Sequence, residues 1–168
     1  MRRMDREITD FQEMVEVMER CDVCRLGLNA AEVPYILPLN FGMEAQNGQV
    51  VLYFHGAKEG TKHDLIARDN RASFEMDCGH RLILDDEKQT CSMIYESVIG
   101  RGLVETVRDS EKLRALKLIM AHYRQEDFPF PEETAAVTTV FKLTVSEMTG
   151  KRRGMRSGER EADWKDNP

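Results

Sequence analysis

Long apolar runs are missing from this sequence. The most apolar stretch, 50–54, has only five residues, whereas a membrane-spanning helix needs about 20. Residues 1–8 carry charges of both signs and lack the apolar core of a secretory signal. We therefore expect a cytoplasmic protein that has reduced thiols and no membrane partner.

An excess of positive charge is missing as well. The chain has 24 lysines and arginines against 30 aspartates and glutamates, which gives a formal net charge of −6. Proteins that bind nucleic acid usually carry a basic excess, because they displace the counterions of the phosphates. We therefore do not expect nucleic acid as a partner. With 168 residues, 41% of them hydrophobic, the chain is long enough to bury one core.

Cysteines are few, and their spacing is poor for a metal site. Cys21 and Cys24 form a C-x-x-C, but Cys78 and Cys91 are too far apart to supply a second close pair, and no histidine spacing matches them. A redox C-x-x-C normally lies at the start of a helix, whereas this one follows the end of a predicted helix. We expect buried structural thiols and no metal, with metal or redox chemistry as the alternative.

Periodicity and turn signals predict many short strands and a few helices. A capping box at 9–12 begins an amphipathic helix over 10–20. Asn47-Gly48 is a strong hairpin signal. Asp109 or Ser110 caps a later helix. A shorter helix is predicted at 62–68, and the predicted strands are 23–28, 35–43, 49–55, 72–76, 82–84, 94–107 and 137–145.

The order of these elements favours an antiparallel sheet over a doubly wound one, because adjacent hairpins need few crossovers. Gly100 and Gly102 lie inside the long strand and indicate a bulge or bend of the kind that closes barrels. We expect a mainly β fold, a small barrel with helices packed on its rim, over residues 1–150. A polar C-terminal tail would follow at 151–168.

The loop at 55–62 is the best candidate binding site. An anionic phosphate needs backbone N–H donors, a positive side chain and often a helix N-terminus. Gly56 and Gly60 allow close backbone approach, Lys62 opens the next helix, and His55 ends the preceding strand. The alternative is a solvated turn with an incidental lysine.

Two further segments have a pattern that suits a ligand. Pro38 lies within a strand pattern and cannot donate to a ladder, so 38–41 is an edge or irregular segment whose free amides suit a planar heterocycle. The alternative is an edge strand that the proline protects. Gly100 and Gly102, which follow the segment 95–99, have two interpretations: they allow the backbone to approach a ligand, or they bend the sheet.

Six stretches, in the same order along nearly the whole chain to residue 151, resemble the pyridoxamine 5′-phosphate oxidase-like FMN-binding split barrels. The similarity is greatest to their nitroimidazole-resistance (Nim-type) branch. We find no counterpart of the arginines and serines with which pyridoxamine phosphate oxidases hold the vitamin's phosphate. The matching stretches are 1–8, 21–27, 34–42, 52–57, 95–100 and 148–151.

The resemblance implies a six-stranded antiparallel split barrel that forms a homodimer, with FMN at the subunit interface. It implies that Lys62 holds the FMN phosphate, helped by the amides of Gly56 and Ala57. It also places His55 beside the flavin, as the catalytic residue. The other cofactor-binding residues that it implies are Pro38, Leu39, Asn40 and Phe41 along the isoalloxazine, and Ser97, Val98 and Ile99 approaching the ring.

The leading hypothesis for function is an FMN-dependent oxidoreductase. A reduced donor such as NADH or NADPH would load the flavin, and a small planar acceptor would take the electrons. The resemblance implies a nitroaromatic or nitroimidazole acceptor. Two alternatives stay open: a flavin-binding carrier or redox sensor without turnover, and a haem-binding split barrel with His55 or His122 as ligand.

Overall fold

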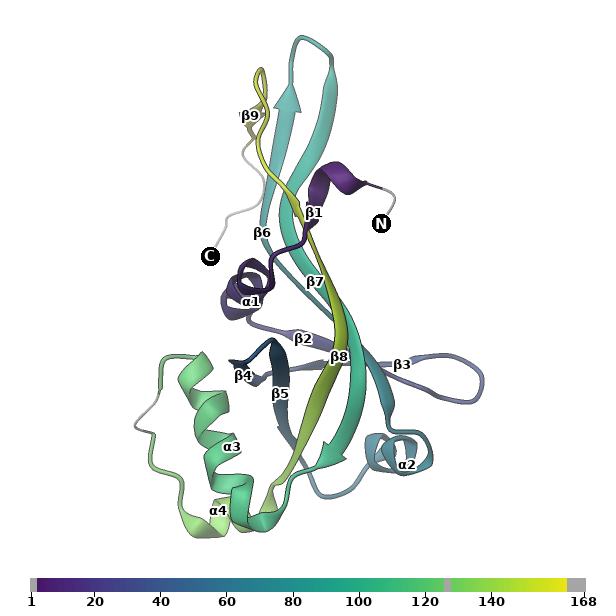
Figure 1. Ribbon diagram of the computed structural model, residues 1–168, viewed down its shortest axis with the longest axis vertical. Coiled ribbons are helices and arrows are strands. Elements are labelled where there is room, and N and C mark those ends of the chain that lie inside the picture. The colour runs from purple at the N-terminus through teal and green to yellow at the C-terminus, as the bar shows by residue number, and fades with distance from the viewer. Residues whose placement is uncertain (1–2, 126–127, 163–168) are drawn as a thin grey trace. The chain divides into compact units, whose positions relative to one another are not determined.

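The chain folds as one antiparallel sheet with helices packed against it. A computed structural model describes residues 3–125 and 128–162 (Figure 1). The residues cluster into two compact units. Unit 1 comprises Met1–Cys21, Asp77–Val98 and Thr149–Pro168, and unit 2 comprises Asp22–Met76 and Ile99–Met148. No helix in the described ranges is long and apolar enough to cross a membrane.

The sheet has nine strands in the described part of the chain, rather than the six expected. Every pairing with a described register is antiparallel. The path ends at β3 and β4 and does not close in the described residues, and two short strands lie off it, β1 (Glu7–Ile8) on β8 and β9 (Arg160–Glu161) on β6. The order is β3 (Tyr35–Leu39), β2 (Cys24–Leu28), β6 (Arg71–Asp85), β7 (Thr90–Thr106), β8 (Thr139–Arg153), β5 (Gln49–Gly56) and β4 (Gly42–Gln46).

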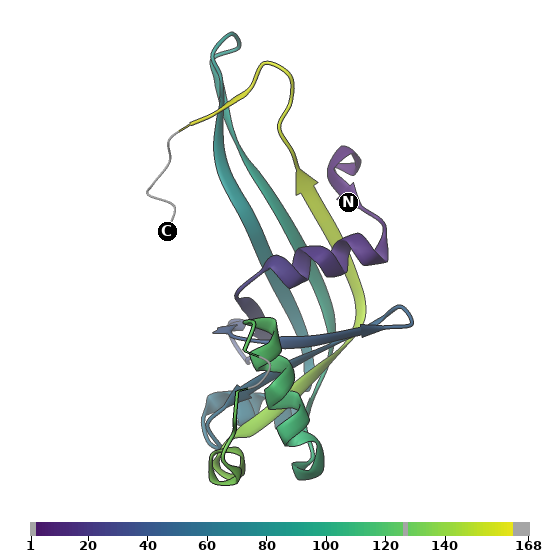
Figure 2. The ribbon, with the colours of Figure 1, turned by 90° about the vertical axis from the view of Figure 1, so that its left-hand side faces the viewer.

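In unit 2, α3 (Asp109–His122) packs against β4 and β5 (Figures 1 and 2). Gly42 makes this possible, because a Cβ at that position would lie 2.5 Å from the α3 backbone at Leu118. The buried cluster beneath comprises Tyr53, Val107, Ala115, Leu116, Ile119 and Val140. Unit 2 also contains α2 (Thr61–Arg68) and α4 (Glu132–Val137), a short helix that the sequence analysis did not predict.

In unit 1, α1 (Phe11–Arg20) follows a single 3-10 turn, η1 (Met4–Arg6), and the strand β1. Met14, Val15, Val17 and Met18 form its buried face. The helix is capped by Asp10, whose carboxylate accepts the Glu13 N–H at 2.9 Å, so the cap is one residue later than the predicted capping box.

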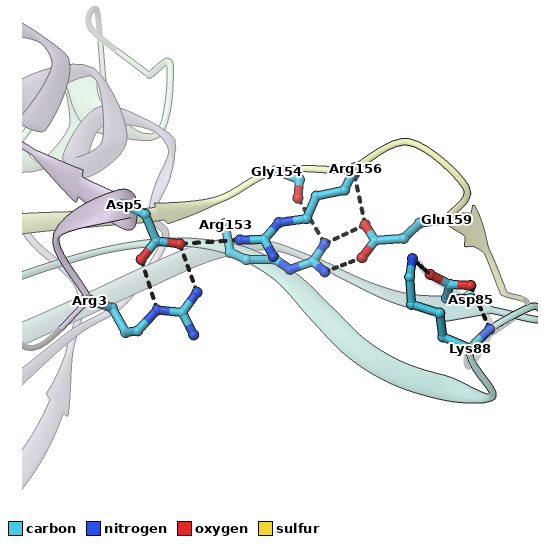
Figure 3. A network of polar contacts seen from close by, with 8 residues as sticks. All are labelled: Arg3, Asp5, Asp85, Lys88, Arg153, Gly154, Arg156 and Glu159. Atoms are coloured by element: carbon cyan, nitrogen blue, oxygen red, sulfur yellow. Dashed lines mark hydrogen bonds and ion pairs between the residues drawn. The ribbon is translucent and has the colours of Figure 1, made fainter.

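The C-terminal part of unit 1 depends on a buried charge pair (Figure 3). Arg153 is only 4% exposed and donates from both terminal nitrogens to the Glu159 carboxylate, at 2.5 and 2.9 Å. This pair holds the turn that leads to β9. The segment expected as a polar tail, 151–168, therefore includes the end of β8 and all of β9, while its last residues, 163–168, lie outside the described ranges.

Several predicted boundaries were wrong, including the end of β8, which extends to Arg153 instead of 145, and the start of β7, which begins at Thr90 instead of 94. The predicted strand 35–43 is two strands, β3 and β4, because Asn40 and Phe41 bond to a side chain instead of to a ladder. The separate strands at 72–76 and 82–84 are one strand, β6, which pairs with β7 beyond a turn at 86–89. The helix α3 has Arg108 at its N-cap, with no side-chain cap, instead of Asp109 or Ser110.

Candidate functional site

The strongest candidate site is the turn in unit 2 that joins β5 to α2. β5 lies between β4 and β8, and its last two residues pair with β8 as His55↔Val140 and Gly56↔Thr139. Gly60 is the N-cap of α2, with φ 129° and ψ 164°, a conformation that only glycine adopts readily. The turn therefore needs its glycine for backbone reasons, and it ends at the open N-terminus of an eight-residue helix.

Lys62 lies directly over Gly56 in this turn. A Cβ added to Gly56 would lie 2.6 Å from the Lys62 Nζ and 3.0 Å from its Cε. No carboxylate of the described residues lies within ion-pair distance of this ammonium. No side chain caps the start of α2, although the His63 N–H already donates to the Gly60 carbonyl oxygen at 2.9 Å. A cation without a carboxylate partner beside an uncapped helix N-terminus is an arrangement that binds an anion.

His63 holds the turn in shape, a role that the sequence analysis missed. Its Nε2 is 2.8 Å from the Ala57 carbonyl oxygen, and its ring lies 5.1 Å from that of Phe141, between centroids. The ring thus connects the start of α2 to the loop and to β8. The sequence offered only one signal for this role, the position of His63 next to Lys62. That signal is weak, because adjacent side chains of a helix point in different directions.

His55 is exposed at the end of β5, after the buried Phe54. The structure therefore brings four predicted residues into one turn and its flanks: His55, Gly56, Ala57 and Lys62. Their contact with a cofactor stays a prediction.

The predicted segment 38–41 lies where β3 ends and β4 begins, also in unit 2. Pro38 pairs with Arg25 on β2, and β3 is one end of the sheet path, which confirms the edge strand. Phe41 is fully buried, and its N–H donates to the Tyr123 hydroxyl at 3.2 Å. This amide is therefore already bonded within the chain.

Tyr123 is a second residue that the sequence analysis did not identify for this site. Besides accepting from Phe41, its hydroxyl accepts from the Asn40 amide nitrogen at 3.1 Å and donates to the Asp22 carbonyl at 2.7 Å. The neighbouring His122 ring lies 4.1 Å from the Phe41 ring. Leu39 is half-buried, and Pro38 and Asn40 are the exposed members of the segment. No hydrogen bond or ion pair between 38–41 and 55–62 is described.

The third predicted segment lies on β7. Ser97 and the buried Val98 belong to unit 1, and Ile99, 53% exposed, belongs to unit 2. A Cβ at Gly100 would meet the Phe74 ring at 2.5 Å, and one at Gly102 would meet the Thr144 carbonyl oxygen at 2.0 Å. Atoms of the chain itself occupy the space beside both glycines, so these glycines serve the packing of the sheet.

A hollow of about 500 Å³ opens on unit 2 between β6, β7 and β8. Asn29, Arg71, Ser73, Arg101 and Ser146 line it, and none of the predicted site residues does. Its two arginines are already paired, Arg71 with Asp69 and Arg101 with Glu147. The described residues include no group of three histidines, cysteines or acidic residues suited to a metal ion.

Comparisons with known proteins agree with the split-barrel resemblance. The family model described as pyridoxamine 5′-phosphate oxidase matches residues 10–152. A candidate 5-nitroimidazole antibiotic resistance protein from Bacteroides thetaiotaomicron is 33% identical, with a TM-score of 0.75 over 86% of this chain and 85% of that one. No curated protein matches the sequence.

More distant structures share the fold. A flavocytochrome from Azotobacter vinelandii is 15% identical, with a TM-score of 0.77 over 100% of this chain and 85% of that one. An FAD-binding protein from Mesorhizobium loti is 19% identical, with a TM-score of 0.65 over 89% of this chain and 98% of that one. The expected mainly β split-barrel architecture is thereby confirmed, with nine strands in an open path in place of six.

Proposed function

This chain belongs to the pyridoxamine 5′-phosphate oxidase-like split-barrel family, and on that premise we propose that it binds FMN and acts as an FMN-dependent oxidoreductase. One observation carries the proposal: the Lys62 ammonium lies over Gly56, has no carboxylate partner in the described chain, and stands at the start of α2. The flavin proteins among its structural relatives support a flavin as the ligand.

The residues of the turn fit the phosphate of FMN. Lys62 supplies a full positive charge, and the amides of Gly56, Ala57 and the uncapped start of α2 before His63 would supply neutral donors. His63 keeps the loop in place by bonding the Ala57 carbonyl. The absence of a side chain at Gly56 leaves the ammonium room to lie close to the backbone, so that both would be available to hold the phosphate.

For the ring system we propose His55 together with the two other predicted segments. His55 is positioned at the mouth of the turn, where its imidazole would donate to or accept from a bound acceptor. Pro38, Leu39 and Asn40 would contribute backbone along one edge of the isoalloxazine, and Phe41, which is fully buried and bonded to Tyr123, would anchor them. Ser97 and Ile99 would approach it from the second subunit of a homodimer, and the buried Val98 between them would hold this part of β7 in place.

The dimer is proposed from apolar surface on unit 2. Ile36 on β3 is 65% exposed, and Ile99 and Leu103 on β7 are 53% and 49% exposed. Apolar side chains of this kind on an open sheet suit a twofold partner of the same kind. Light scattering tests this directly: we expect twice the chain mass at micromolar concentration, and a monomer would contradict the proposal.

Bound flavin supplies hydride and electron transfer, while the protein supplies position and electrostatics. We propose that NADH or NADPH is the donor and that a small planar nitro compound is the acceptor. The 33% identical relative, whose own description concerns 5-nitroimidazole resistance, supports this acceptor class. His55 would orient the acceptor and hold a proton at its ring nitrogen.

The decisive experiment is an FMN titration followed by flavin fluorescence. Lys62→Ala should weaken FMN binding at least tenfold and leave riboflavin, which lacks the phosphate, almost unaffected. Lys117→Ala removes an exposed lysine of α3 in the same unit and is the matched control. If Lys62→Ala binds FMN as the unchanged protein does, the phosphate site is elsewhere.

Turnover separates an enzyme from a flavin carrier. NADH or NADPH should bleach the flavin absorbance, and a nitroimidazole should restore it under anaerobic conditions. His55→Asn should slow that second step while FMN affinity stays the same. Tight FMN binding with no reduction by either nucleotide would instead indicate the carrier or sensor, and a Soret band in the purified protein would indicate haem.

A further inference from the structure

Two cysteines of unit 1 that are far apart in the sequence point their thiols at one oxygen atom. Cys21 directly follows α1, and its Sγ donates to the Val17 carbonyl oxygen at 3.3 Å. Cys78, on β6, donates to the same oxygen at 3.9 Å. The Cys21 side chain is also a hydrogen-bonding neighbour of the Cys78 thiol. The two sulfur atoms are therefore close neighbours before any bond forms.

The two thiols differ in their exposure. Cys21 is only 2% exposed, whereas Cys78 is half-buried and open to a small reagent. In a reactive pair of thiols, the exposed thiol usually reacts first with the reagent. The buried thiol then attacks the mixed disulfide and is called the resolving thiol. Cys78 is accordingly the thiol to be attacked from solution, and Cys21 the resolving one.

Charged groups surround Cys78 on the sides formed by α1, β7 and β8. The Arg20 guanidinium, from α1, contacts its thiol and also donates to the Glu96 carboxylate on β7 at 2.5 Å. Arg152, from β8, bonds the same carboxylate. Burial, the largest influence, raises the pKa of the Cys78 thiol, and Glu96 raises it further, while Arg20 and Cys21 lower it. Thiolate at Cys78 should therefore form more readily as the pH rises above neutral.

The other two cysteines are poor partners for this chemistry. Cys24 is fully buried, and burial raises the pKa of its thiol far above the ordinary value. Cys91 is exposed near the tip of the β6–β7 hairpin, and none of its described contacts is with another cysteine. The pair that the structure brings together is thus not the C-x-x-C of the sequence.

We propose that Cys21 and Cys78 form a redox site, which small disulfides such as oxidised glutathione convert to an intramolecular disulfide. The Cys78 thiolate attacks one sulfur of the small disulfide, the S–S bond breaks, and one thiolate leaves. The Cys21 thiolate then displaces the second small thiol from Cys78. Two protein thiols are oxidised and lose two protons, and one small disulfide is reduced to two thiols.

The disulfide would covalently join the C-terminal end of α1 to β6 within unit 1. At present the thiols make only weak hydrogen bonds to Val17, at 3.3 and 3.9 Å. Neither cysteine is among the residues of the proposed flavin site, so this inference goes beyond the flavin function and does not depend on it.

The test uses the folded, full-length chain with Cys91→Ser, which removes an exposed thiol without disturbing a core. After treatment with oxidised glutathione we expect a protein roughly 2 Da lighter and free of glutathione. Trypsin leaves Cys21 and Cys24 in the same peptide, so tandem mass spectrometry must show which of the two is bonded to Cys78. We expect Cys21. The rate should rise several-fold between pH 7 and pH 9.

Second variants, made in the same background, check the roles of the two thiols. Cys21→Ser should accumulate a stable glutathione adduct on Cys78, and Cys78→Ser should take up none. A stable adduct on Cys78 while Cys21 is present, a bond that includes Cys24, or no reaction of the folded protein would each overturn the proposal.

Discussion

Gly56→Ala is the sharpest test of the phosphate turn, because it adds one methyl group at a defined place. The new Cβ would lie 2.6 Å from the Lys62 Nζ and 3.0 Å from its Cε, closer than such atoms can approach. The obstructing group is the far end of a flexible side chain, so the lysine must move while the backbone can stay. The substitution therefore displaces the ammonium from its place over the turn.

The expected loss can be worked from that displacement. A hydrogen bond to a charged group contributes about 1.5–3 kcal/mol. Losing one between Lys62 and the FMN phosphate should weaken binding about 10- to 150-fold, since each 1.4 kcal/mol is a factor of ten. Fold stability should change little, because the backbone of Gly56 is not in the left-handed region and replacing glycine by alanine itself stabilises by about 0.4–1 kcal/mol through the unfolded chain.

Isothermal titration with FMN and with riboflavin, together with thermal unfolding, gives the required measurements. Gly154→Ala is the matched control, since a Cβ there would meet nothing within 4 Å. We expect Gly56→Ala to lose FMN affinity, keep riboflavin affinity and unfold within a few degrees of the unchanged protein. Unchanged FMN affinity in a folded Gly56→Ala protein would refute the reasoning, as would an equal loss for riboflavin.

Three more predictions concern contacts that stabilise the fold. Tyr123→Phe should destabilise the fold by roughly 1–3 kcal/mol in urea unfolding, because the Phe41 amide and two other groups lose their partner; no change would mean that water replaces the hydroxyl. Gly102→Ala should cost at least about 1–3 kcal/mol in the same assay, since its Cβ would lie 2.0 Å from the Thr144 carbonyl oxygen, a backbone atom that cannot move aside. Burial raises the pKa of Glu96, but hydrogen bonds from two arginines outweigh burial and hold this pKa below the ordinary 4.5. Glu96→Gln should therefore lower the free energy of unfolding by its full amount at pH 7, and the difference from the unchanged protein should shrink as the pH falls below about 4.5. A difference that does not depend on pH would contradict the assignment.

Local signals predicted several elements well. The Asn47-Gly48 turn has positive φ at both residues, 53° and 76°, as a type I′ hairpin requires. The face of α1 follows the helical period, and the loop before α2 needs Gly60 for its backbone. Each of these features depends on residues within a few positions of one another, so the local sequence is sufficient to predict it.

Features that depend on distant residues were not predictable in the same way. The break between β3 and β4 results from the Tyr123 hydroxyl, more than 80 positions away in the chain. The long β6–β7 pairing runs through a segment whose own propensities are weak, and it gains the support of β9. The periodicity of a segment reports on its own residues and not on contacts with residues far away in the sequence.

The proposed phosphate site illustrates this division within a single turn. That Gly56, Gly60 and Lys62 belong to one loop between a strand and a helix could be predicted from the residues alone, because it follows from local backbone chemistry. That the Lys62 ammonium lies over Gly56 and that His63 bonds the Ala57 carbonyl became visible in the folded chain. The same is true of the proximity of Cys21 and Cys78. The physical reason is that strand and helix type depend on local torsions, whereas side-chain contacts depend on how the whole sheet pairs.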